Sequence, residues 1–306
     1  MTDMTEFQKN IKENCSDLEL RCNEPMASHT SFRIGGPAEI MAFPKNIGEL
    51  SKLMEVSALL DIQPAILGAG TNVLAPDQGI PGLVICLKDC LDGMELLDDH
   101  SIRVMAGVTM TRAAVFAANH GLSGLEFAHG IPGTVGGGVY MNAGAYGGEI
   151  CQVCSAVEVM DRSGRIQVLS AEEMDFSYRH SVLEDRFGIA VSAVFQLTPK
   201  PVDEIRARMK ELMAKRSASQ PLDMPSAGSA FKRPVGGYAA ALIDQSGLKG
   251  YQVGGAAIST KHAGFAVNLG GATAADVENL LCQVSDIVFE KTGIRLEPEV
   301  RVWNKI

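Results

Sequence analysis

Stretches with helical spacing of apolar residues alternate along the chain with shorter apolar runs typical of buried strands. Helical spacing predicts a helix over 49–60 and another over 111–119, the second capped by Thr109 and ended at Gly121. The short apolar runs predict strands at 65–67, 83–87, 157–160, 165–169 and 189–197, and a hairpin from 94–99 and 102–106. The first third of the chain is therefore mixed α and β. Within it, the first 24 residues show only a weak helical pattern.

The pattern changes near residue 200, where Pro199 and Pro201 interrupt it. The stretch 203–216 then predicts a charged amphipathic helix, with apolar residues on one side. We therefore expect a domain boundary close to residue 200.

The last hundred residues carry their own helix and strand signals. A strand is predicted at 263–269, and Thr273 with Asp276 fits a capping box at the start of a helix that Gly293 ends. The segment 294–303 is predicted to form a closing strand, in which alternation places Glu299 on the charged face.

The stretch 121–148 is so rich in glycine that we expect an ordered loop there, and no ordinary helix or strand interior. Glycine permits positive φ and lets main-chain N–H groups approach a ligand, as the diphosphate of a dinucleotide requires. The alternative is a run of tight turns that serves packing only. The apolar residues interleaved with the glycines favour a site for a large anionic cofactor.

Charge and cysteine content limit the possible partners and location. The 306 residues carry a net charge of −9, which argues against nucleic acid and anionic membranes as partners. Seven cysteines, an odd number, fit reduced thiols, and the polar N-terminal stretch has no signal-peptide pattern. No apolar run is long enough to span a membrane. We therefore expect a cytoplasmic protein.

Cysteine spacing leaves one alternative for the chemistry. Cys151 and Cys154 have the spacing of a redox pair, and together with Cys86 and Cys90 they form a possible four-sulfur zinc site. Both pairs lie in or beside strand-like apolar runs, so buried structural cysteines are the favoured interpretation, and no metal is expected.

Several motifs in a fixed order give the chain a family resemblance. Together they closely resemble the UDP-N-acetylenolpyruvoylglucosamine reductases (MurB), from about Pro25 to the end of the chain. The motifs are HTSFRIGG at 29–36, LGAGTNVL at 67–74, GIPGTVGG at 130–137, MNAGA at 141–145, FSYRHS at 176–181, SAGSAFK at 226–232, LKGYQVGG at 248–255, KHAG at 261–264 and EPEVR at 297–301.

The resemblance implies an α+β fold with two parts. It implies a vanillyl-alcohol-oxidase-type (PCMH-like) FAD-binding region of two α+β subdomains and a C-terminal α+β substrate domain. On this basis we expect an N-terminal segment at 1–24, the FAD-binding region at 25–200, split near residue 88, and the substrate domain at 201–306. A Rossmann fold is not expected, because Val73 stands where the third glycine of the dinucleotide fingerprint belongs.

The resemblance also implies a cofactor site built from two glycine-rich segments around the diphosphate and ribityl chain of non-covalently bound FAD. Mapped residue by residue, the cofactor-binding positions are Arg33, Gly68, Gly70, Thr71, Asn72, Val73, Leu74, Gly130, Ile131, Pro132, Gly133, Val135, Gly136, Gly137, Asn142 and Gly144.

The chemistry implied by the resemblance is reduction of an enol ether with NADPH as the reductant. Hydride addition to the enolpyruvyl group builds negative charge on the substrate carboxylate, and a proton must then reach the α carbon. Arg179 matches the carboxylate-stabilising arginine, Ser229 the proton donor, and Glu299 the acidic partner. Taken singly, Arg179 also fits a surface salt bridge, Ser229 a turn-capping hydroxyl and Glu299 a solvated strand face.

The implied substrate is UDP-N-acetylglucosamine enolpyruvate, used in peptidoglycan precursor synthesis. Tyr178, Lys232, Arg233, Lys261 and His262 are the candidate substrate-binding residues. Arg233 departs from the commoner family pattern, which has asparagine there, so its role is open. The short interval from Arg179 to Ser229 resembles the shorter class of these reductases, which lacks an extra substrate-covering loop.

Two other functions remain open from the residues alone. One is a different flavin oxidase or dehydrogenase on the same fold, and the other is a non-catalytic flavin or nucleotide-sugar binding protein. The joint presence of Arg179, Ser229 and Glu299 favours the reductase, because a binder gains nothing from a proton donor. No obligate protein partner is implied.

Overall fold

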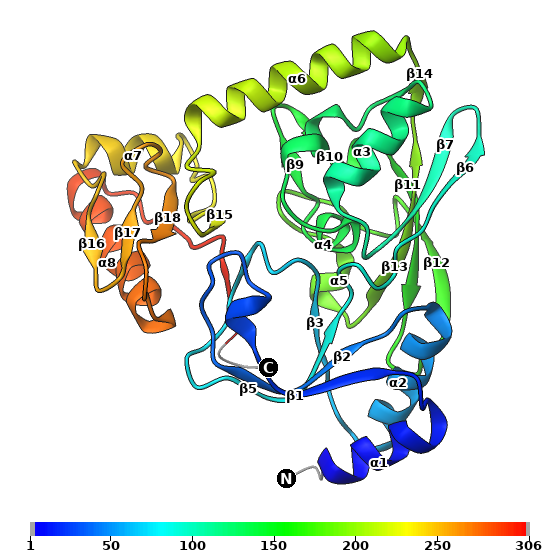
Figure 1. Ribbon diagram of the computed structural model, residues 1–306. Coiled ribbons are helices and arrows are strands. Elements are labelled where there is room, and N and C mark those ends of the chain that lie inside the picture. Colours follow the sequence, from blue (N-terminus) through cyan, green and yellow to red (C-terminus); the bar gives the residue numbers. More distant parts are fainter. Residues whose placement is uncertain (1–3, 304–306) are drawn as a thin grey trace. The chain divides into compact units, whose positions relative to one another are not determined.

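The computed structural model describes residues 4–303, which divide into two compact units. The first unit contains the described residues up to Cys22, Ile40–Ala69 and Gly82–Lys215. The second contains Asn23–Glu39, Gly70–Pro81 and the described residues from Arg216 onward. Four of the divisions fall within strands β1 (Glu19–Pro25), β2 (Pro37–Phe43) and β5 (Ile80–Cys86) and inside helix α6 (Val202–Ser219). The fifth lies between Ala69 and Gly70, after strand β3 (Ala65–Leu67). Figure 1 shows these elements along the chain.

The compact units do not coincide with the expected domains. The last division lies between Lys215 and Arg216, inside the helix predicted at 203–216, which continues without a break to Ser219. Two earlier segments of the chain also belong to the second unit. As functional domains, 1–24, 25–200 and 201–306 stay a prediction.

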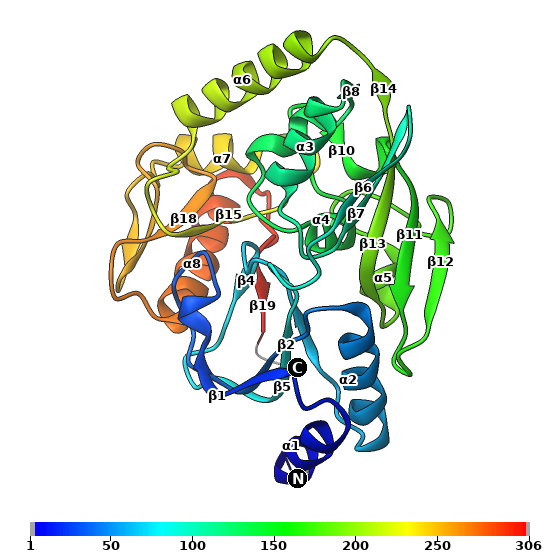
Figure 2. The ribbon, with the colours of Figure 1, turned by 45° about the vertical axis from the view of Figure 1, so that its right-hand side comes forward.

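The first unit begins with two helices on a small sheet. Helix α1 (Met4–Asn14) lies beside α2 (Ile47–Leu59), as Figures 1 and 2 show. The sheet has the strand order β1-β2-β5-β3, and β3 (Ala65–Leu67) runs parallel to β5. Phe7, Leu50, Leu53 and Ile85 are fully buried in the core between these elements. Asn46 caps α2 by accepting from the Glu49 amide, so this helix begins at Ile47, two residues before the predicted start at 49.

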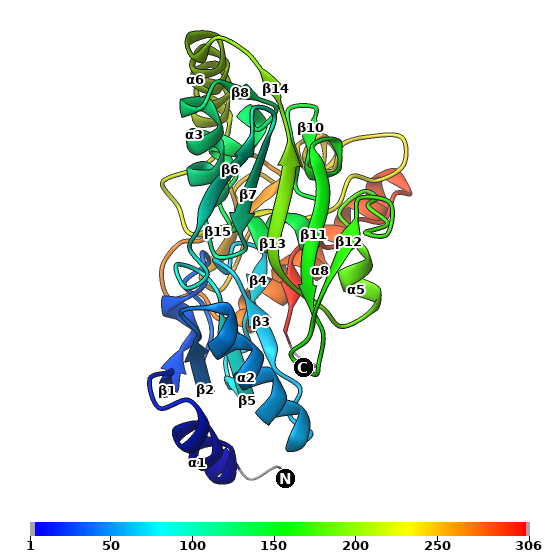
Figure 3. The same ribbon diagram turned by 90° about the vertical axis from the view of Figure 1, so that its right-hand side faces the viewer.

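A second apolar core in the same unit lies on a five-stranded antiparallel sheet. Its strand order is β12-β11-β13-β7-β6, and Figure 3 shows these strands side by side. The bounds of the strands are β6 Met94–Asp98, β7 Ser101–Met105, β11 Cys154–Met160, β12 Ile166–Ser170 and β13 Ile189–Gln196. The predicted hairpin of 94–99 with 102–106 is confirmed by the pairing of β6 with β7.

Short elements connect this sheet to the glycine-rich stretch. Helix α3 (Met110–Asn119) begins at its predicted cap, Thr109, whose hydroxyl accepts from the Arg112 amide. The remaining elements are β8 Leu122–Ser123, the 3-10 turn η2 Glu126–Gly130, α4 Val135–Tyr140, β9 Gly144–Ala145, β10 Gly148–Glu149, the 3-10 turn η3 Ile150–Gln152, α5 Val182–Asp185 and β14 Thr198–Pro199.

The expectation of a loop without helix over 121–148 is wrong in one place. Helix α4 contains Gly136 and Gly138. A Cβ added at Gly136 would come within 2.9 Å of the Ala106 Cβ, and one at Gly138 within 2.8 Å of the Met110 sulfur. Side chains at these two positions would therefore crowd Ala106 and Met110, and tertiary packing outweighs the low helix propensity of glycine.

The second unit builds one core from a four-stranded sheet and two helices. The strand order is β15-β18-β17-β16, packed with α7 and α8. The bounds are β15 Ser226–Ser229, α7 Ala239–Gln245, β16 Gln252–Val253, β17 Ala256–Ile258, β18 Phe265–Asn268 and α8 Ala274–Thr292, with the 3-10 turn η1 (Met26–Ser28) and β4 (Val73–Leu74) from the earlier segments. The predicted Thr273–Asp276 capping box and the left-handed Gly293 end of α8 are both confirmed.

The predicted closing strand at 294–303 is wrong over most of its length. Only β19 (Arg301–Val302) is a strand, and it runs parallel to β4. The residues before β19 make isolated backbone hydrogen bonds instead of the continuous series of a strand pair. The Lys232 amide donates to the Glu297 carbonyl, and the Glu299 amide donates to the Ala230 carbonyl. This segment therefore follows β15 and its continuation without forming a regular strand.

Candidate functional site

The two glycine-rich segments predicted to hold FAD meet within the first unit. The segment that begins at Gly68 follows β3 directly, and the segment 130–137 leads from η2 into α4. A Cβ built at Gly68 would lie only 2.5 Å from the Thr134 Oγ1, so the Gly68 backbone approaches the second segment as closely as a glycine allows. Thr134 is buried, and its hydroxyl caps α4 by accepting from the Gly137 amide.

Main-chain donors are available where these two segments meet. Among residues 4–303, the amide groups of Gly68, Ala69 and Gly133 donate to no protein acceptor, although all three residues are at most partly exposed. Gly133 has φ +133°, a conformation that glycine permits. Partly buried amides without protein partners normally meet a ligand or water, and converging N–H groups suit a diphosphate. The residues present therefore fit the dinucleotide that the sequence predicts.

We expect Gly68→Ala to weaken FAD binding about tenfold or more, because the new methyl group must push the Gly68 and Thr134 segments apart. Equilibrium titration with FAD, followed by quenching of flavin fluorescence, measures this. Gly237→Ala is the control, since a Cβ there meets nothing within 4 Å and φ is not positive. Equal affinity of the two variants would contradict the assignment of Gly68 to the cofactor site.

The rest of the first glycine-rich segment, from Gly70 to Leu74, belongs to the second unit. Gly70 has φ +60°, and its carbonyl accepts from the Ser31 amide. The Asn72 side chain donates to the Glu299 carbonyl at 3.2 Å, and Val73 with Leu74 forms β4. Arg33, exposed and with φ +57°, lies in the same unit. Cofactor contacts by these residues stay a prediction.

Arg179 lies at the tip of a tight turn in the first unit. Ser177 and His180 form an antiparallel bridge around it, with backbone hydrogen bonds of 3.1 and 3.2 Å. The backbone of Arg179 is left-handed, with φ +58°, which is uncommon outside glycine and marks a position held by its surroundings. Its Nη2 donates to the Gly144 carbonyl at 3.3 Å, and its guanidinium lies 5.2 Å from the ring centre of Tyr178.

The second unit brings Ser229 and Glu299 next to each other in space. Ser229 ends β15, and the Glu299 amide donates to the carbonyl of the following residue, Ala230. The Ser229 side chain is exposed, and among residues 4–303 its hydroxyl makes no hydrogen bond. The turn-capping alternative for this hydroxyl is therefore not what the structure shows, and the group is available to a substrate.

Of the candidate substrate-binding residues, Lys232 lies closest along the chain to Ser229. Its ammonium group forms an ion pair with Glu297, while the Arg233 guanidinium stacks 4.5 Å from the ring centre of Tyr238. Both pairs are at the surface, where a stronger anionic partner can replace the present one.

Lys261 and His262 make contacts that already explain their presence. The Lys261 ammonium donates to the Ser217 carbonyl at 2.7 Å, and the His262 Nδ1 accepts from the Gly264 amide at 3.1 Å. Burial lowers the pKa of His262, which keeps its imidazole neutral. His262 therefore offers an anion no fixed positive charge, unlike Lys232 and Arg233, and the Lys261 ammonium is already bonded to a backbone carbonyl. The substrate contacts of Lys261 and His262 stay a prediction.

All seven cysteines are free thiols, and the structural interpretation of Cys86, Cys90, Cys151 and Cys154 fits their surroundings. Burial raises the pKa of Cys90 and of Cys154 to about 12, so neither is a thiolate near neutral pH. Among residues 4–303, no group of three or more His, Cys, Asp or Glu side chains is arranged to hold a metal ion.

A family model described as an FAD binding domain matches residues 38–170, and one described as the C-terminal domain of UDP-N-acetylenolpyruvoylglucosamine reductase matches residues 220–303. The UDP-N-acetylenolpyruvoylglucosamine reductase of Agathobacter rectalis is 46% identical over 97% of this chain and 98% of its own length. The chain belongs to this reductase family.

Further members of the reductase family support the same assignment. The reductase of Caldanaerobacter subterraneus is 45% identical over 95% of this chain and 96% of its own length. The crystal structure of the reductase (MurB) from Thermus caldophilus has a TM-score of 0.77 and 37% identity, over 94% of this chain and 98% of that one. The predicted fold class, an α+β FAD-binding region followed by a MurB C-terminal domain, is confirmed.

Two features near the site were not predicted from the sequence of this reductase-family member. Thr134 joins the glycine-rich segments, and Glu149 contacts the Asn142 side chain at 3.3 Å. The Asn142 side chain, expected to contact FAD, is 1% exposed and hydrogen-bonded within the protein. The signal available was the place of Asn142 in the motif MNAGA at 141–145, which does not reveal the contacts of its side chain.

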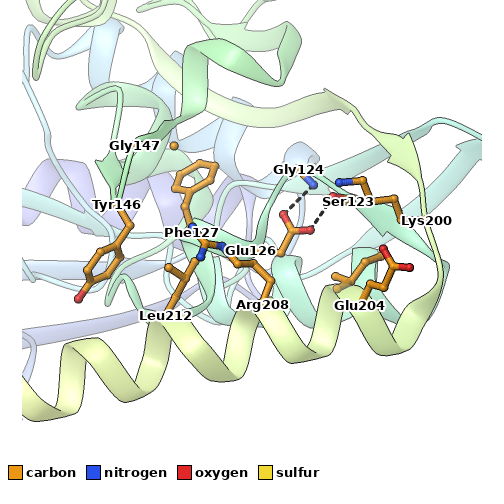
Figure 4. A pocket seen from close by; sticks show the side chains of 12 residues that line it. Ser123, Gly124, Glu126, Phe127, Tyr146, Gly147, Lys200, Glu204, Arg208 and Leu212 are labelled. Atoms are coloured by element: carbon orange, nitrogen blue, oxygen red, sulfur yellow. Dashed lines mark hydrogen bonds between the residues drawn. The ribbon is translucent and has the colours of Figure 1, made fainter.

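A pocket of about 470 Å³ lies in the first unit between the turn at Tyr146 and helix α6. Figure 4 shows Arg208 and Leu212 of α6 near Phe127, and Glu126 accepting from Ser123 and Gly124. The pocket is lined by none of the predicted site residues, so it is separate from the site described above.

The described helices include none long and apolar enough to cross a membrane.

Proposed function

We propose that this chain reduces UDP-N-acetylglucosamine enolpyruvate to UDP-N-acetylmuramate, with FAD as cofactor and NADPH as reductant, in peptidoglycan precursor synthesis. Membership of the reductase family over nearly the full chain carries the proposal. The unpartnered amides of Gly68, Ala69 and Gly133 supply the donors that the FAD diphosphate requires. Bound FAD, once reduced by NADPH, supplies the hydride for the terminal enolpyruvyl carbon.

In this proposal the protein has two tasks in the chemistry. Arg179 binds both oxygens of the substrate carboxylate and stabilises the negative charge that builds there. Its guanidinium stays charged at any working pH, which a lysine does not guarantee. The Ser229 hydroxyl then gives a proton to the α carbon, with Glu299 close to it in the second unit. Addition of a hydride and a proton across the double bond converts the enol ether into a lactyl ether.

Substrate binding is assigned to exposed cations and an aromatic ring. Lys232 and Arg233 face the diphosphate of the nucleotide sugar, with Tyr178, Lys261 and His262 as further contacts. Arg233 offers a bidentate donor where the commoner pattern has a neutral amide. We place the enzyme in the cytoplasm, because all seven thiols are free and fit a reducing compartment. No obligate protein partner is part of the proposal.

A turnover measurement tests this function. With FAD-loaded protein, NADPH oxidation is expected to depend on the enolpyruvyl nucleotide, and mass spectrometry of the product is expected to show a gain of two hydrogen atoms. Oxygen-dependent turnover of a small alcohol without any use of the enolpyruvyl nucleotide would instead show an oxidase on the same fold. Binding of the nucleotide without turnover would show a binding protein.

A further inference from the structure

The Asn142 side chain is at the centre of a buried hydrogen-bond network beside Arg179. Asn142 follows helix α4, is 1% exposed and has φ +40°. Its Nδ2 donates to the Ser177 carbonyl at 2.9 Å and to the Glu149 Oε2 at 3.3 Å. Its Oδ1 accepts from the Cys151 amide at 2.9 Å. Both N–H donors of the carboxamide are therefore used inside the protein.

One of these bonds fixes the turn that carries Arg179. Ser177 is one of the two bridge residues that enclose Tyr178 and Arg179, so its backbone position sets that of the tip. The other end of the turn is held by Ser181, which is fully buried and donates to the Tyr140 carbonyl at 2.8 Å. The turn is thus attached at one end to Asn142 and at the other to Tyr140, the last residue of α4.

The second bond fixes the carbonyl that binds the Arg179 guanidinium. Glu149 pairs directly with Gly144 in the β9–β10 hairpin, and the Gly144 carbonyl accepts from the Arg179 Nη2. A Cβ at Gly144 would lie 2.6 Å from the Glu149 Cγ, so the two residues are in tight contact. Asn142 therefore connects the backbone of the Arg179 turn with the hairpin that holds the Arg179 side chain.

We propose that Asn142 and Glu149 form a positioning pair that aims Arg179 at the substrate carboxylate, an assignment that rests on the proposed function. Asn142 acts through Arg179 and not by holding FAD, because its donors are committed to Ser177 and Glu149. The role requires a carboxamide: an aspartate at 142 has the same shape but cannot donate to the Ser177 carbonyl, and it would face the Glu149 carboxylate with like charge.

The test is a double-mutant cycle read by stopped-flow absorbance. The protein is reduced with NADPH without oxygen, mixed with enolpyruvyl nucleotide, and the return of the flavin colour is timed. Asn142→Asp is expected to slow this step about 10- to 100-fold, the cost of roughly 1 Å of misplacement. FAD affinity and the preceding reduction by NADPH are expected to change by less than about threefold.

The second arm of the cycle separates positioning from general damage. In an Arg179→Met background, Asn142→Asp is expected to cause almost no further slowing, because the group that it positions is already gone. Equal slowing with and without Arg179 would overturn the positioning role, and a large loss of FAD affinity would show that Asn142 serves the cofactor. Asn119→Asp, an exposed change in the same unit whose Oδ1 still accepts from Arg206, is the control for added charge.

A rescue variant exchanges donor and acceptor between the side chains at positions 142 and 149. In Asn142→Asp with Glu149→Gln, the glutamine amide can donate to the new carboxylate, so part of the lost rate is expected to return. Absence of any recovery would contradict the direct contact between the two side chains. If Asn142→Asp fails to fold in a thermal melt, Glu149→Ala, at a partly exposed site, takes its place in the same cycle.

The outcomes distinguish this proposal from the proposed function. If the unmodified protein does not recover colour with the enolpyruvyl nucleotide, the proposed function fails and the positioning pair fails with it. If the unmodified protein recovers colour and the cycle is additive, only the positioning pair fails.

Discussion

Replacing Ser229 with alanine is expected to slow reduction of the enolpyruvyl nucleotide about 10²–10⁴-fold, the usual contribution of one positioned proton donor. The structure supports this role because the Ser229 hydroxyl is exposed and, in the described part of the chain, is engaged by no other group. Removing it leaves no buried partner unsatisfied, so stability is expected to change little. FAD binding and reduction by NADPH are expected to stay as they are.

Rapid-mixing absorbance separates these steps, because NADPH bleaches the flavin and the substrate restores its colour. Only the second phase should slow in Ser229→Ala. Ser226→Ala, in the same strand β15, is the matched control, since it removes a hydroxyl without touching the assigned proton donor. Unchanged colour recovery in Ser229→Ala would remove this residue from the mechanism.

Replacing Arg179 with methionine is expected to lower the rate of substrate reduction about 10²–10³-fold, comparable to the loss of one donor that stabilises a developing anion. The guanidinium is held at a turn tip with positive φ and bound to the Gly144 carbonyl, so it is preorganised before the substrate arrives. Arg179→Lys keeps the charge but loses the bidentate geometry, and we expect a rate between those of the methionine variant and the unmodified protein.

Steady-state kinetics with the enolpyruvyl nucleotide provide the measurement. A loss in kcat larger than the rise in KM indicates stabilisation of the transition state over ground-state binding. A rise in KM alone, with kcat intact, would mean that Arg179 only binds substrate. A melting temperature close to that of the unmodified protein confirms that the variant is folded.

Local sequence signals predicted those elements whose ends carry their own chemistry. Helix α3 begins at Thr109, and α8 lies between its capping box and Gly293, because the capping residues satisfy the exposed amides and carbonyls of the helix ends. Helix α4 could not be predicted in this way. Gly136 and Gly138 pack against Ala106 and Met110, which are distant in sequence.

The closing segment 294–303 shows a different limit of sequence reasoning. Its apolar alternation is real, since Leu296 and Val300 are buried. Alternation does not specify which backbone groups will be paired, however, and here only Arg301 and Val302 meet a neighbouring strand in register. The alternation therefore predicted burial only in part, because Pro298 and Val302 on the same face are exposed, and the strand itself was not predicted correctly.

The residues of the candidate site fall into two groups, those that a sequence motif indicated and those that only contacts in the fold reveal. Gly68, Gly133, Arg179 and Ser229 lie in motifs whose resemblance to the reductase family named their roles. The functions of Thr134 and Glu149 depend on contacts across the fold, with Gly68 in one case and with Asn142 in the other. Such contacts have no characteristic spacing in the sequence, so only the folded structure reveals them.

The central claim is that this chain holds FAD and passes a hydride from it to the enolpyruvyl nucleotide. A single-turnover experiment without oxygen tests it most directly: protein loaded with FAD and reduced by one equivalent of NADPH is mixed with one equivalent of the nucleotide. We predict full return of the oxidised flavin spectrum, with one lactyl ether formed per flavin. A flavin that stays reduced after the nucleotide is added, or a polypeptide that takes up no FAD, would contradict the claim.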